Sequence, residues 1–423
     1  MNHVEHFCQG ESHKLNDKPC QDYAYAETSD NLSIAIVCDG HGGERYFRSQ
    51  IGAKYATEIT KDAIHTYVKE MLSSFIDSDK AAKSVFDGTH FTKYSEAIAT
   101  DLQVNTQAHE SLIWLFSSII SQWNNRISQH AKENDLTEWE LEHVEKEYQD
   151  DFREKRTLSE TSFEKTYGCT LMAYVQTPDY WFAFQIGDGK FVSMHLVDGK
   201  ITCEQPIPWD ERCFLNKTTS LCDANAKDEF RYCYEGNGEF PVAVFLGSDG
   251  IDDTYGDGSN LYNFYIKLLE IIIRNGQKCA QKELVVNLPK ISKLGSKDDM
   301  SVVCIYNENE FEGLFSKLTG YQKDELKHQI DLLKKKIREL EDKIKDLGDC
   351  KLLEKSQQIS LDYAKKDLEK AKHHEKKLGL KLRTIKGVET KYNNSLKEKA
   401  DSASSEQEDS ILNENGNELS NKQ

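Results

Sequence analysis

Four short apolar runs in this chain each carry an aspartate at one end, beside a glycine or a second aspartate. The runs are IVCDGHGG with Asp39, QIGDG with Asp188, FLGSDG with Asp249 and GSKDDMSV with Asp298. A carboxylate at a strand end points off the sheet edge, so strands built from these runs would bring the four aspartates into one cleft. Carboxylates gathered in this way repel one another unless cations neutralise them. A single Asp-Gly pair is more often a turn, but four together favour a metal site.

Cysteine and histidine add no recognisable metal-binding spacing to this pattern. The eleven cysteines are scattered singly, with no Cys-x-x-Cys pair, so we expect neither a disulfide framework nor structural zinc. The available ligands are oxygens, which select the hard cations Mg²⁺ or Mn²⁺ over zinc. Unpaired cysteines are typical of a reducing compartment, and we therefore predict a cytoplasmic protein.

The runs around these aspartates predict a mixed domain. Short apolar stretches bounded by Gly, Asp or Pro predict strands, and amphipathic stretches predict helices. Strands, then helices, then strands again favour an α+β domain with a largely antiparallel sheet over residues 1–315. Residues 66–165 lack a strong strand signal and predict helical cover or an insertion, and 206–240 predict an irregular loop beside the cleft. The predicted strands are 32–38, 170–176, 181–186, 242–246 and 301–306, and the predicted helices are 46–64, 111–130 and 261–274.

The C-terminal part of the chain follows another period. Seven apolar residues from Leu326 to Leu347 alternate spacings of four and three, the core pattern of a coiled coil. Gly348 interrupts it, and a looser apolar set from Leu368 to Leu396 follows. We predict a coiled-coil helical hairpin over 316–400, whose seam closes on itself, on a second copy or on another protein. The polar composition of 401–423 predicts a disordered tail.

The charge is unevenly divided. The formal net charge is −18, composed of −21 for residues 1–316, +8 for 317–400 and −5 for 401–423. The acidic balance argues against a partner such as nucleic acid or an anionic membrane, because both need positive surface. No apolar run approaches the roughly 20 residues of a membrane-spanning helix, and the N-terminus lacks the pattern of a secretory signal.

Six motifs in order resemble those of the metal-dependent protein phosphatases of the protein phosphatase 2C type, particularly the compact bacterial members. They are GESH followed by PCQD, then DGHGG, YGCTL, IGDG, GSDG and GSKDD. Their order and approximate spacing match the family from residue 8 to about 306. The resemblance implies a four-layer α-β-β-α sandwich of two antiparallel sheets flanked by helices, with the helical hairpin as a C-terminal extension.

The resemblance also implies a metal centre of two ions. Asp39 matches the carboxylate that bridges both ions, and the Gly40 carbonyl matches a further ligand of one of them. Asp249 and Asp298 match the remaining ligands of the other ion.

Three more residues match the family at this centre. Asp22 corresponds to the acidic residue of the N-terminal motif. Asp188, together with Asp249, corresponds to a third, weaker metal site found in many members. His41 matches the general acid that protonates the leaving oxygen, a task that suits a positioned imidazole.

Two departures concern the N-terminal motif. Many members have Glu where this chain has Gln21, whose amide can bond a metal-bound water but brings no charge. Many also place a phosphate-gripping Arg where this chain has Asp17. His13, Lys14 and Lys18 are candidates to replace it, and the two lysines would act as point charges without the bidentate grip of arginine.

The implied activity is hydrolysis of phosphoserine or phosphothreonine in proteins by a water activated between two Mg²⁺ or Mn²⁺ ions. Its partners would be a phosphorylated protein and a cognate Ser/Thr kinase. One alternative is a weakly active or inactive phosphatase-like sensor or scaffold that signals through its coiled coil. Another keeps the chemistry but takes a small phosphorylated metabolite as substrate.

Overall fold

The structure is a computed structural model of the 423-residue chain, which divides into two compact units, Met1–Phe311 and Glu312–Gln423. This division lies close to the predicted boundary after residue 315. The two units are described separately below. The residues that the structure describes are 1–71, 85–86, 89–91, 106–143, 146, 149–150, 163–207, 209–210, 213, 217–256, 258–348 and 355–420.

Two antiparallel sheets form the centre of the first unit. One sheet has the order β1-β11-β10-β7-β8 and the other β2-β3-β5-β6-β9-β4. The strands of the first are β1 Asn2–Cys8, β7 Lys190–Val197, β8 Lys200–Glu204, β10 Ala243–Gly247 and β11 Met300–Tyr306. Those of the second are β2 Tyr23–Thr28, β3 Ser33–Cys38, β4 Thr89–Phe91, β5 Leu171–Gln176, β6 Trp181–Ile186 and β9 Arg231–Glu235.

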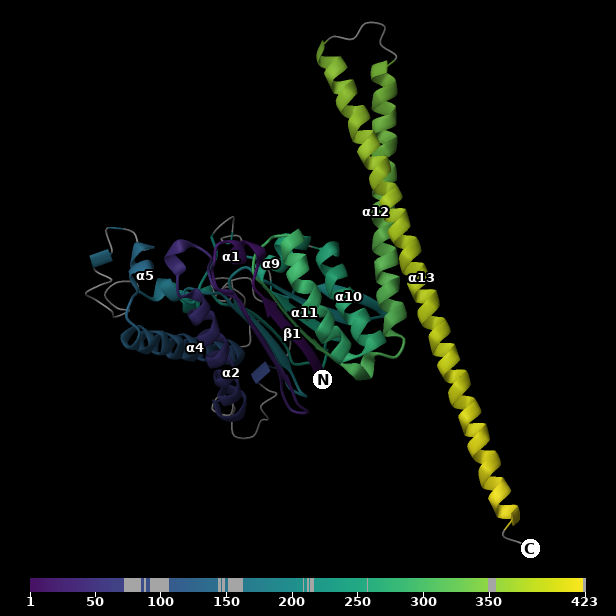
Figure 1. Ribbon diagram of the computed structural model, residues 1–423, viewed down its shortest axis with the longest axis horizontal. Helices are drawn as coiled ribbons and strands as arrows, with labels where there is room; N and C mark the ends of the chain where they lie inside the picture. The colour runs from purple at the N-terminus through teal and green to yellow at the C-terminus, as the bar shows by residue number, and fades with distance from the viewer. Residues whose placement is uncertain are drawn as a thin grey trace. The chain divides into compact units, whose positions relative to one another are not determined.

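Helices cover the outer face of each sheet, as Figure 1 shows. On one side, α2 (Ser49–Thr66) and α4 (Thr106–Glu133) share an apolar core with β3, β5, β6 and β9. On the other, α9 (Asp249–Tyr255), α10 (Ser259–Asn275) and α11 (Gln277–Leu294) pack on the first sheet. A second core that includes Val37, Met172, Leu246 and Val303 lies between the sheets. This is the predicted four-layer α-β-β-α sandwich.

Shorter segments complete this unit. They are α1 Glu11–Leu15, α5 Glu138–Glu142, α8 Ala226–Glu229, the 3₁₀ turns η1 Glu44–Tyr46, η6 Phe163–Tyr167 and η7 Glu308–Glu310, and the π-helical turn η2 Tyr67–Met71.

The five predicted strands are present to within a residue or two because each is buried on both faces and reads as an apolar run. Sequence patterns missed β1, β2, β7, β8 and β9, in which polar and charged residues interrupt the apolar run. The expectation of an irregular loop over 206–240 was wrong for β9, a buried strand between β6 and β4. Within 66–165, β4 pairs with β9, so this segment adds a short strand to its helices.

Antiparallel pairing gathers the acidic motifs at one edge. Gly247 at the end of β10 pairs with Lys190 at the start of β7 and lies opposite Val302 near the start of β11. In the other sheet, Tyr23 at the start of β2 pairs with Cys38 at the end of β3. In each sheet the end of one strand therefore lies beside the start of its antiparallel neighbour. The aspartates that follow or precede these strands all lie at this same end of the strands.

The second unit is an antiparallel helical pair, α12 (Leu314–Gly348) and α13 (Lys355–Ser420). Every residue of the predicted seam from Leu326 to Leu347 is buried or half-buried, with Leu326 and Ile337 the least exposed. On α13 the buried stripe begins earlier than predicted and includes Leu361, Ala364 and Ala371. The helical hairpin is therefore observed with a longer seam.

Two features at the end of α13 differ from expectation. Leu396, predicted in the seam, is 46 % exposed. Phe315, the second residue of α12, contacts Tyr392, so α12 begins close to this point and Leu396 lies past it on α13. The segment 401–423, predicted to be disordered, continues the helix as far as Ser420. Extending a helix that has already nucleated costs far less than starting one.

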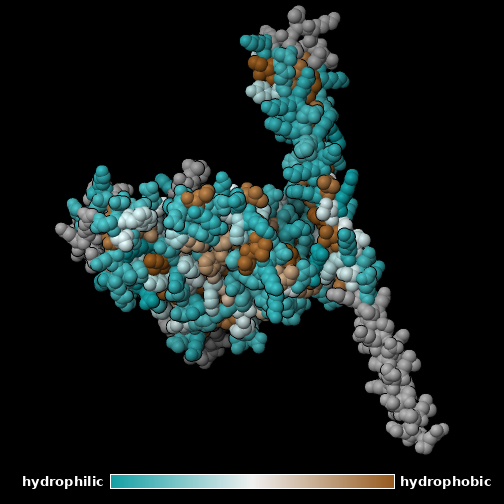
Figure 2. Space-filling view, viewed as in Figure 1, coloured by the Kyte–Doolittle hydropathy of each residue, from teal (hydrophilic) through white to brown (hydrophobic). Residues whose placement is uncertain are grey.

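No helix in the described ranges is both long and apolar enough to cross a membrane. The visible face in Figure 2 is mainly hydrophilic, with brown apolar patches interspersed.

Candidate metal centre and active site

Asp39 and Asp249 lie at the centre of the acidic cluster. Asp39 follows β3, where its backbone N–H donates to the Thr170 hydroxyl and its carbonyl accepts from the Thr170 N–H at 2.7 Å. Asp249 opens α9 directly after β10. Burial, the charges of Asp22 and Asp249, and a hydrogen bond with Asp249 raise the pKa of Asp39 well above its usual range. Burial and the neighbouring Asp188 and other carboxylates raise the pKa of Asp249 to about 7, although its hydrogen bond with Asp39 opposes the shift.

Asp22 joins this pair from the start of β2. Its side chain is fully buried, and burial together with the Asp299 and Asp249 charges raises its pKa. Among the described residues, neither carboxylate oxygen accepts a hydrogen bond of ordinary geometry, although the Ser248 and Ser301 hydroxyls are close enough to oppose the rise in pKa. A buried carboxylate left in this state requires a proton or a cation.

Asp188 occupies the tight turn between β6 and β7. Gly187 has φ +111°, and a Cβ there would lie 2.5 Å from Thr170 Cβ, so the turn requires glycine. Gln185 Nε2 donates to the Gly189 carbonyl at 2.6 Å and holds the turn in place. Burial raises the pKa of Asp188, and its charge acts on both Asp39 and Asp249.

Asp298 lies next to Asp299 and His13, and its charge acts on Asp249. The donor atoms of these three residues all lie within 4.8 Å of one another, a spacing that can hold a metal ion. His13 Nδ1 lies 2.9 Å from Asp299 Oδ2, and its Nε2 lies 3.8 Å from Asp298 Oδ1. Burial opposes protonation of His13, but the hydrogen bond and charge of Asp299 outweigh it and raise the pKa of the imidazole.

Asp299 connects three segments that are far apart in sequence. Its Oδ1 accepts from the Gly10 N–H at 2.6 Å and its Oδ2 from the Gln21 N–H at 2.5 Å, in addition to the His13 contact. A Cβ at Gly10 would lie 2.2 Å from the Asp298 carbonyl carbon, so the two segments are in close contact. Asp299 therefore fixes the N-terminal motif against the start of β11.

His41 follows Asp39 and Gly40 in the loop after β3. Its backbone N–H donates to Gly168 O, its carbonyl accepts from Ser49 Oγ at 3.0 Å and Gln21 Nε2 at 3.2 Å, and its ring packs edge-on against Tyr46. Burial lowers the pKa of His41 to about 4. The free imidazole is thus neutral near pH 7, and the charge of a bound phosphate would favour its protonated form.

The candidate phosphate-binding residues lie in three different settings. His13 is buried against Asp299, Lys14 is exposed on α1, and Lys18 Nζ donates to Gly42 O at 2.9 Å. A Cβ at Gly42 would lie 3.8 Å from both His13 Nε2 and Gln21 Oε1, so His13 and Lys18 both approach the loop that carries His41. Of the three, these two are the better placed.

The carboxylate cluster fits a divalent-cation site. Asp39 and Asp249 can share a hydrogen bond only if one of them holds a proton, and Asp22 has no ordinary partner in the described chain. The donors of this cluster are oxygens, as Mg²⁺ and Mn²⁺ prefer. Gln21 Oε1 is also buried without a hydrogen bond from the described residues.

A comparison with protein families identifies the class. The protein phosphatase 2C profile matches residues 9–288, and the chain belongs to this family. A comparison with curated proteins finds no match.

A comparison with solved structures finds several phosphatases among the similar chains. A bacterial serine phosphatase is 15 % identical, covering 73 % of this chain and 98 % of that one with a TM-score of 0.38. The serine/threonine phosphatase Stp1 from Staphylococcus aureus is 15 % identical, covering 73 % and 95 % with a TM-score of 0.38. The catalytic domain of the serine threonine protein phosphatase PstP, in complex with two manganese ions, is 14 % identical, covering 72 % and 96 % with a TM-score of 0.36.

Proposed function

We propose that this protein is a Mg²⁺- or Mn²⁺-dependent phosphatase that hydrolyses phosphoserine or phosphothreonine in proteins. The observation that carries the proposal is the convergence of Asp22, Asp39, Asp188 and Asp249 at the strand ends of the two sheets. Burial raises the pKa of each, and neighbouring carboxylates raise it further for Asp22, Asp39 and Asp249. Without a cation, carboxylates packed in this way retain protons near pH 7, and a divalent cation can take the place of those protons.

In this proposal most of the clustered acidic residues would bind metal ions. Asp39, the Gly40 carbonyl, Asp249 and Asp298 would hold two ions, with Asp22 close by, and Asp188 would help to hold a third. Bound ions would supply charge that ionises a water and neutralises phosphoryl oxygens.

His41 would donate a proton to the leaving oxygen, and its backbone carbonyl is fixed by Ser49 and Gln21. His13 and Lys18 would orient the phosphate beside Gly42. Phosphoryl transfer demands mainly such positioning and charge.

The test is hydrolysis of p-nitrophenyl phosphate and of a phosphothreonine peptide with Mn²⁺ and with EDTA. We expect turnover with Mn²⁺, none with EDTA, and a loss of at least about 10³-fold in Asp39→Asn. Turnover that survives both EDTA and this substitution would refute the mechanism. Robust peptide turnover would exclude the sensor or scaffold alternative that Gln21 motivates, and a panel of phosphorylated metabolites tests the small-molecule alternative.

We further propose that the protein acts in cytoplasmic signalling opposite a Ser/Thr kinase. The ten cysteines in the described part of the chain are free, as a reducing compartment favours. The second unit would serve self-association or the docking of a partner.

A further inference from the structure

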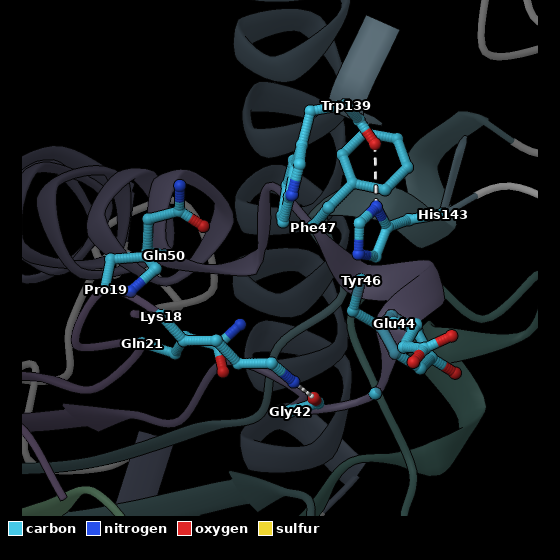
Figure 3. A pocket seen from close by; sticks show the side chains of 11 residues that line it. Lys18, Pro19, Gln21, Gly42, Glu44, Tyr46, Phe47, Gln50, Trp139 and His143 are labelled. Carbon is cyan, nitrogen blue, oxygen red and sulfur yellow. Dashed lines mark hydrogen bonds between the residues drawn. The ribbon is translucent and has the colours of Figure 1, made fainter. Parts of the chain in front are cut away.

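A shallow, open hollow lies beside the loop that carries His41. Its lining includes the rings of Tyr46, Phe47, Trp139 and His143, with Lys18, Glu44 and Gln50 among its polar residues. The His143 ring lies against one side of the Trp139 ring, with centroids 4.0 Å apart. Figure 3 shows these side chains around the hollow, with Gly42 at its lower end and Trp139 at its upper end. The hollow adjoins the carboxylate cluster but does not include its aspartates.

Trp139 is exposed yet held in place. It is 55 % exposed on α5, a helix of five residues. Arg48, itself buried, forms a two-point ion pair with Glu140, Nε to Oε1 at 2.6 Å and Nη2 to Oε2 at 3.0 Å. The guanidinium also donates to the Asn134 and Asp135 carbonyls just before the helix. An exposed indole on a segment anchored this firmly is a preformed binding surface.

The hollow lies next to the loop that carries His41. The Tyr46 ring packs on the His41 ring with centroids 4.7 Å apart, and Gly42 and Gly43 line the hollow directly after His41. A side chain bound there would belong to a residue close in sequence to the one whose phosphate lies at the metal centre.

The polar groups of the hollow favour a cation. The Glu44 carboxylate makes no hydrogen bond or ion pair within the described chain, and Gln50 Oε1 is buried there without a hydrogen bond. Lys18 already donates to Gly42 O. Glu138 and Glu142 flank Trp139 on α5, and residues 1–316 have a net charge of −21. Aromatic faces next to a carboxylate and a free acceptor suit a guanidinium, which stacks and donates at once.

We propose that this hollow is a specificity subsite that binds an arginine of the phosphoprotein substrate, stacked on Trp139 and facing Glu44. This inference rests on the proposed phosphatase function, because it names the class of substrate for the same centre. It assigns substrate selection to α5, outside the metal-binding motifs.

The experiment uses the full chain with Mn²⁺ and otherwise neutral phosphothreonine peptides in which one arginine is moved from four residues before to four residues after the phosphate. At the preferred position, arginine is compared with citrulline, its neutral isostere, and with leucine. We expect kcat/KM to favour arginine over citrulline about tenfold. In Trp139→Ala the preference for arginine over citrulline should fall from about tenfold to less than about twofold. In Glu44→Gln it should fall to about threefold.

The matched control is Trp114→Ala, since Trp114 is a 40 % exposed tryptophan on α4 outside the hollow. It should keep the tenfold ratio. Each ratio is accompanied by the same variant's rate with p-nitrophenyl phosphate, which has no flanking residues. A ratio near one at every position, or a preference for leucine, overturns the arginine subsite while leaving the phosphatase intact.

Absence of any Mn²⁺-dependent turnover would instead overturn the proposed function. Peptide binding then decides the subsite separately: fluorescence anisotropy with Asp39→Asn should show about tenfold tighter binding of the arginine peptide, and this difference should vanish when Trp139→Ala is added. Equal binding of the arginine and citrulline peptides overturns the subsite.

Discussion

The two units of this chain differ in how their charged side chains are arranged: like charges are packed together in the first, and opposite charges are paired in the second. At the strand ends of the first unit, buried carboxylates are packed against one another, and burial together with their mutual repulsion raises the pKa values of Asp22, Asp39 and Asp249. In the second unit, charges on facing helices are complementary. Lys323 contacts Glu389 at 2.7 Å across the seam, and Lys372 contacts Glu341 at the same distance.

This difference separates a site built for a ligand from an interface built for stability. Like charges held together destabilise the free protein and give a cation its binding energy. Complementary charges around an apolar seam neutralise one another and require no bound ion. The contrast predicts that the first unit responds strongly to metal and pH, and the second chiefly to loss of packing.

The largest effect should come from Asp249→Asn. Removing one carboxylate from the cluster should lower Mn²⁺-dependent hydrolysis at least about 10³-fold while raising the melting temperature of the metal-free first unit, because repulsion is relieved. Activity assays and calorimetry in EDTA measure the two changes. A variant that loses activity and stability together would show that Asp249 is held by contacts rather than strained by charge.

The next effect is a pH dependence of the metal-free protein. The folded-state pKa of Asp249, about 7, lies above its ordinary value of 3.8, so the folded chain binds more protons between these values. Stability is therefore greatest at the acidic end and falls as pH rises through 7, by an amount on the order of a few kcal/mol. Calorimetry from pH 5 to 8 should show this fall, and Mn²⁺ should reverse it most at pH 8. A melting temperature that rises over this range would contradict the cluster's electrostatics.

A packing change should rank third and act on the second unit alone. Leu378 is 4 % exposed in the seam, whereas Leu380, two residues away, is 64 % exposed. Leu378→Ala should destabilise the helical pair by about 2–4 kcal/mol, and Leu380→Ala by less than about 0.5 kcal/mol. Hydrogen exchange of α12 and α13 measures both. Equal effects of the two substitutions would mean that the seam lies elsewhere on α13.

The smallest effect should come from the charges of the second unit. Glu389 accepts from both Lys323 Nζ and the Thr319 hydroxyl, so Glu389→Gln should cost about 1 kcal/mol. Glu341→Gln, at an exposed pair, should produce no measurable change in the same exchange experiment. A larger loss of stability in Glu341→Gln than in Glu389→Gln would contradict the expectation that the half-buried pair contributes more than the exposed one.

The central carboxylates could be found from sequence because their signal is local. Asp39, Asp188 and Asp249 each lie within two residues of the end of an apolar strand, and antiparallel pairing then brings the strand ends together. The heptad spacing from Leu326 to Leu347 is likewise a local signal, because it lies within one continuous stretch of sequence.

The supporting residues could not be found in this way. Asp299 contacts Gly10 and Gln21 across most of the unit, and no local pattern marks which of two adjacent aspartates is the structural one. The sequence around Arg48 and around Glu140 shows no feature that marks them as partners, and only the fold brings these distant residues together. The α13 seam was only partly found because small alanines and glutamates such as Glu389 occupy it alongside leucines.

The pairing of β1 with β11 constrains how the chain is made. Asn2 lies opposite Tyr306 and Cys8 opposite Met300, so β1 leaves the ribosome long before the strand that pairs with it. At synthesis rates of about 5–20 residues per second this delay is roughly 15–60 s. Over that time the acidic N-terminal motif and the unpaired edge of β1 remain without their partner, and early protection by a chaperone becomes as relevant to this protein's output as the chemistry of its site.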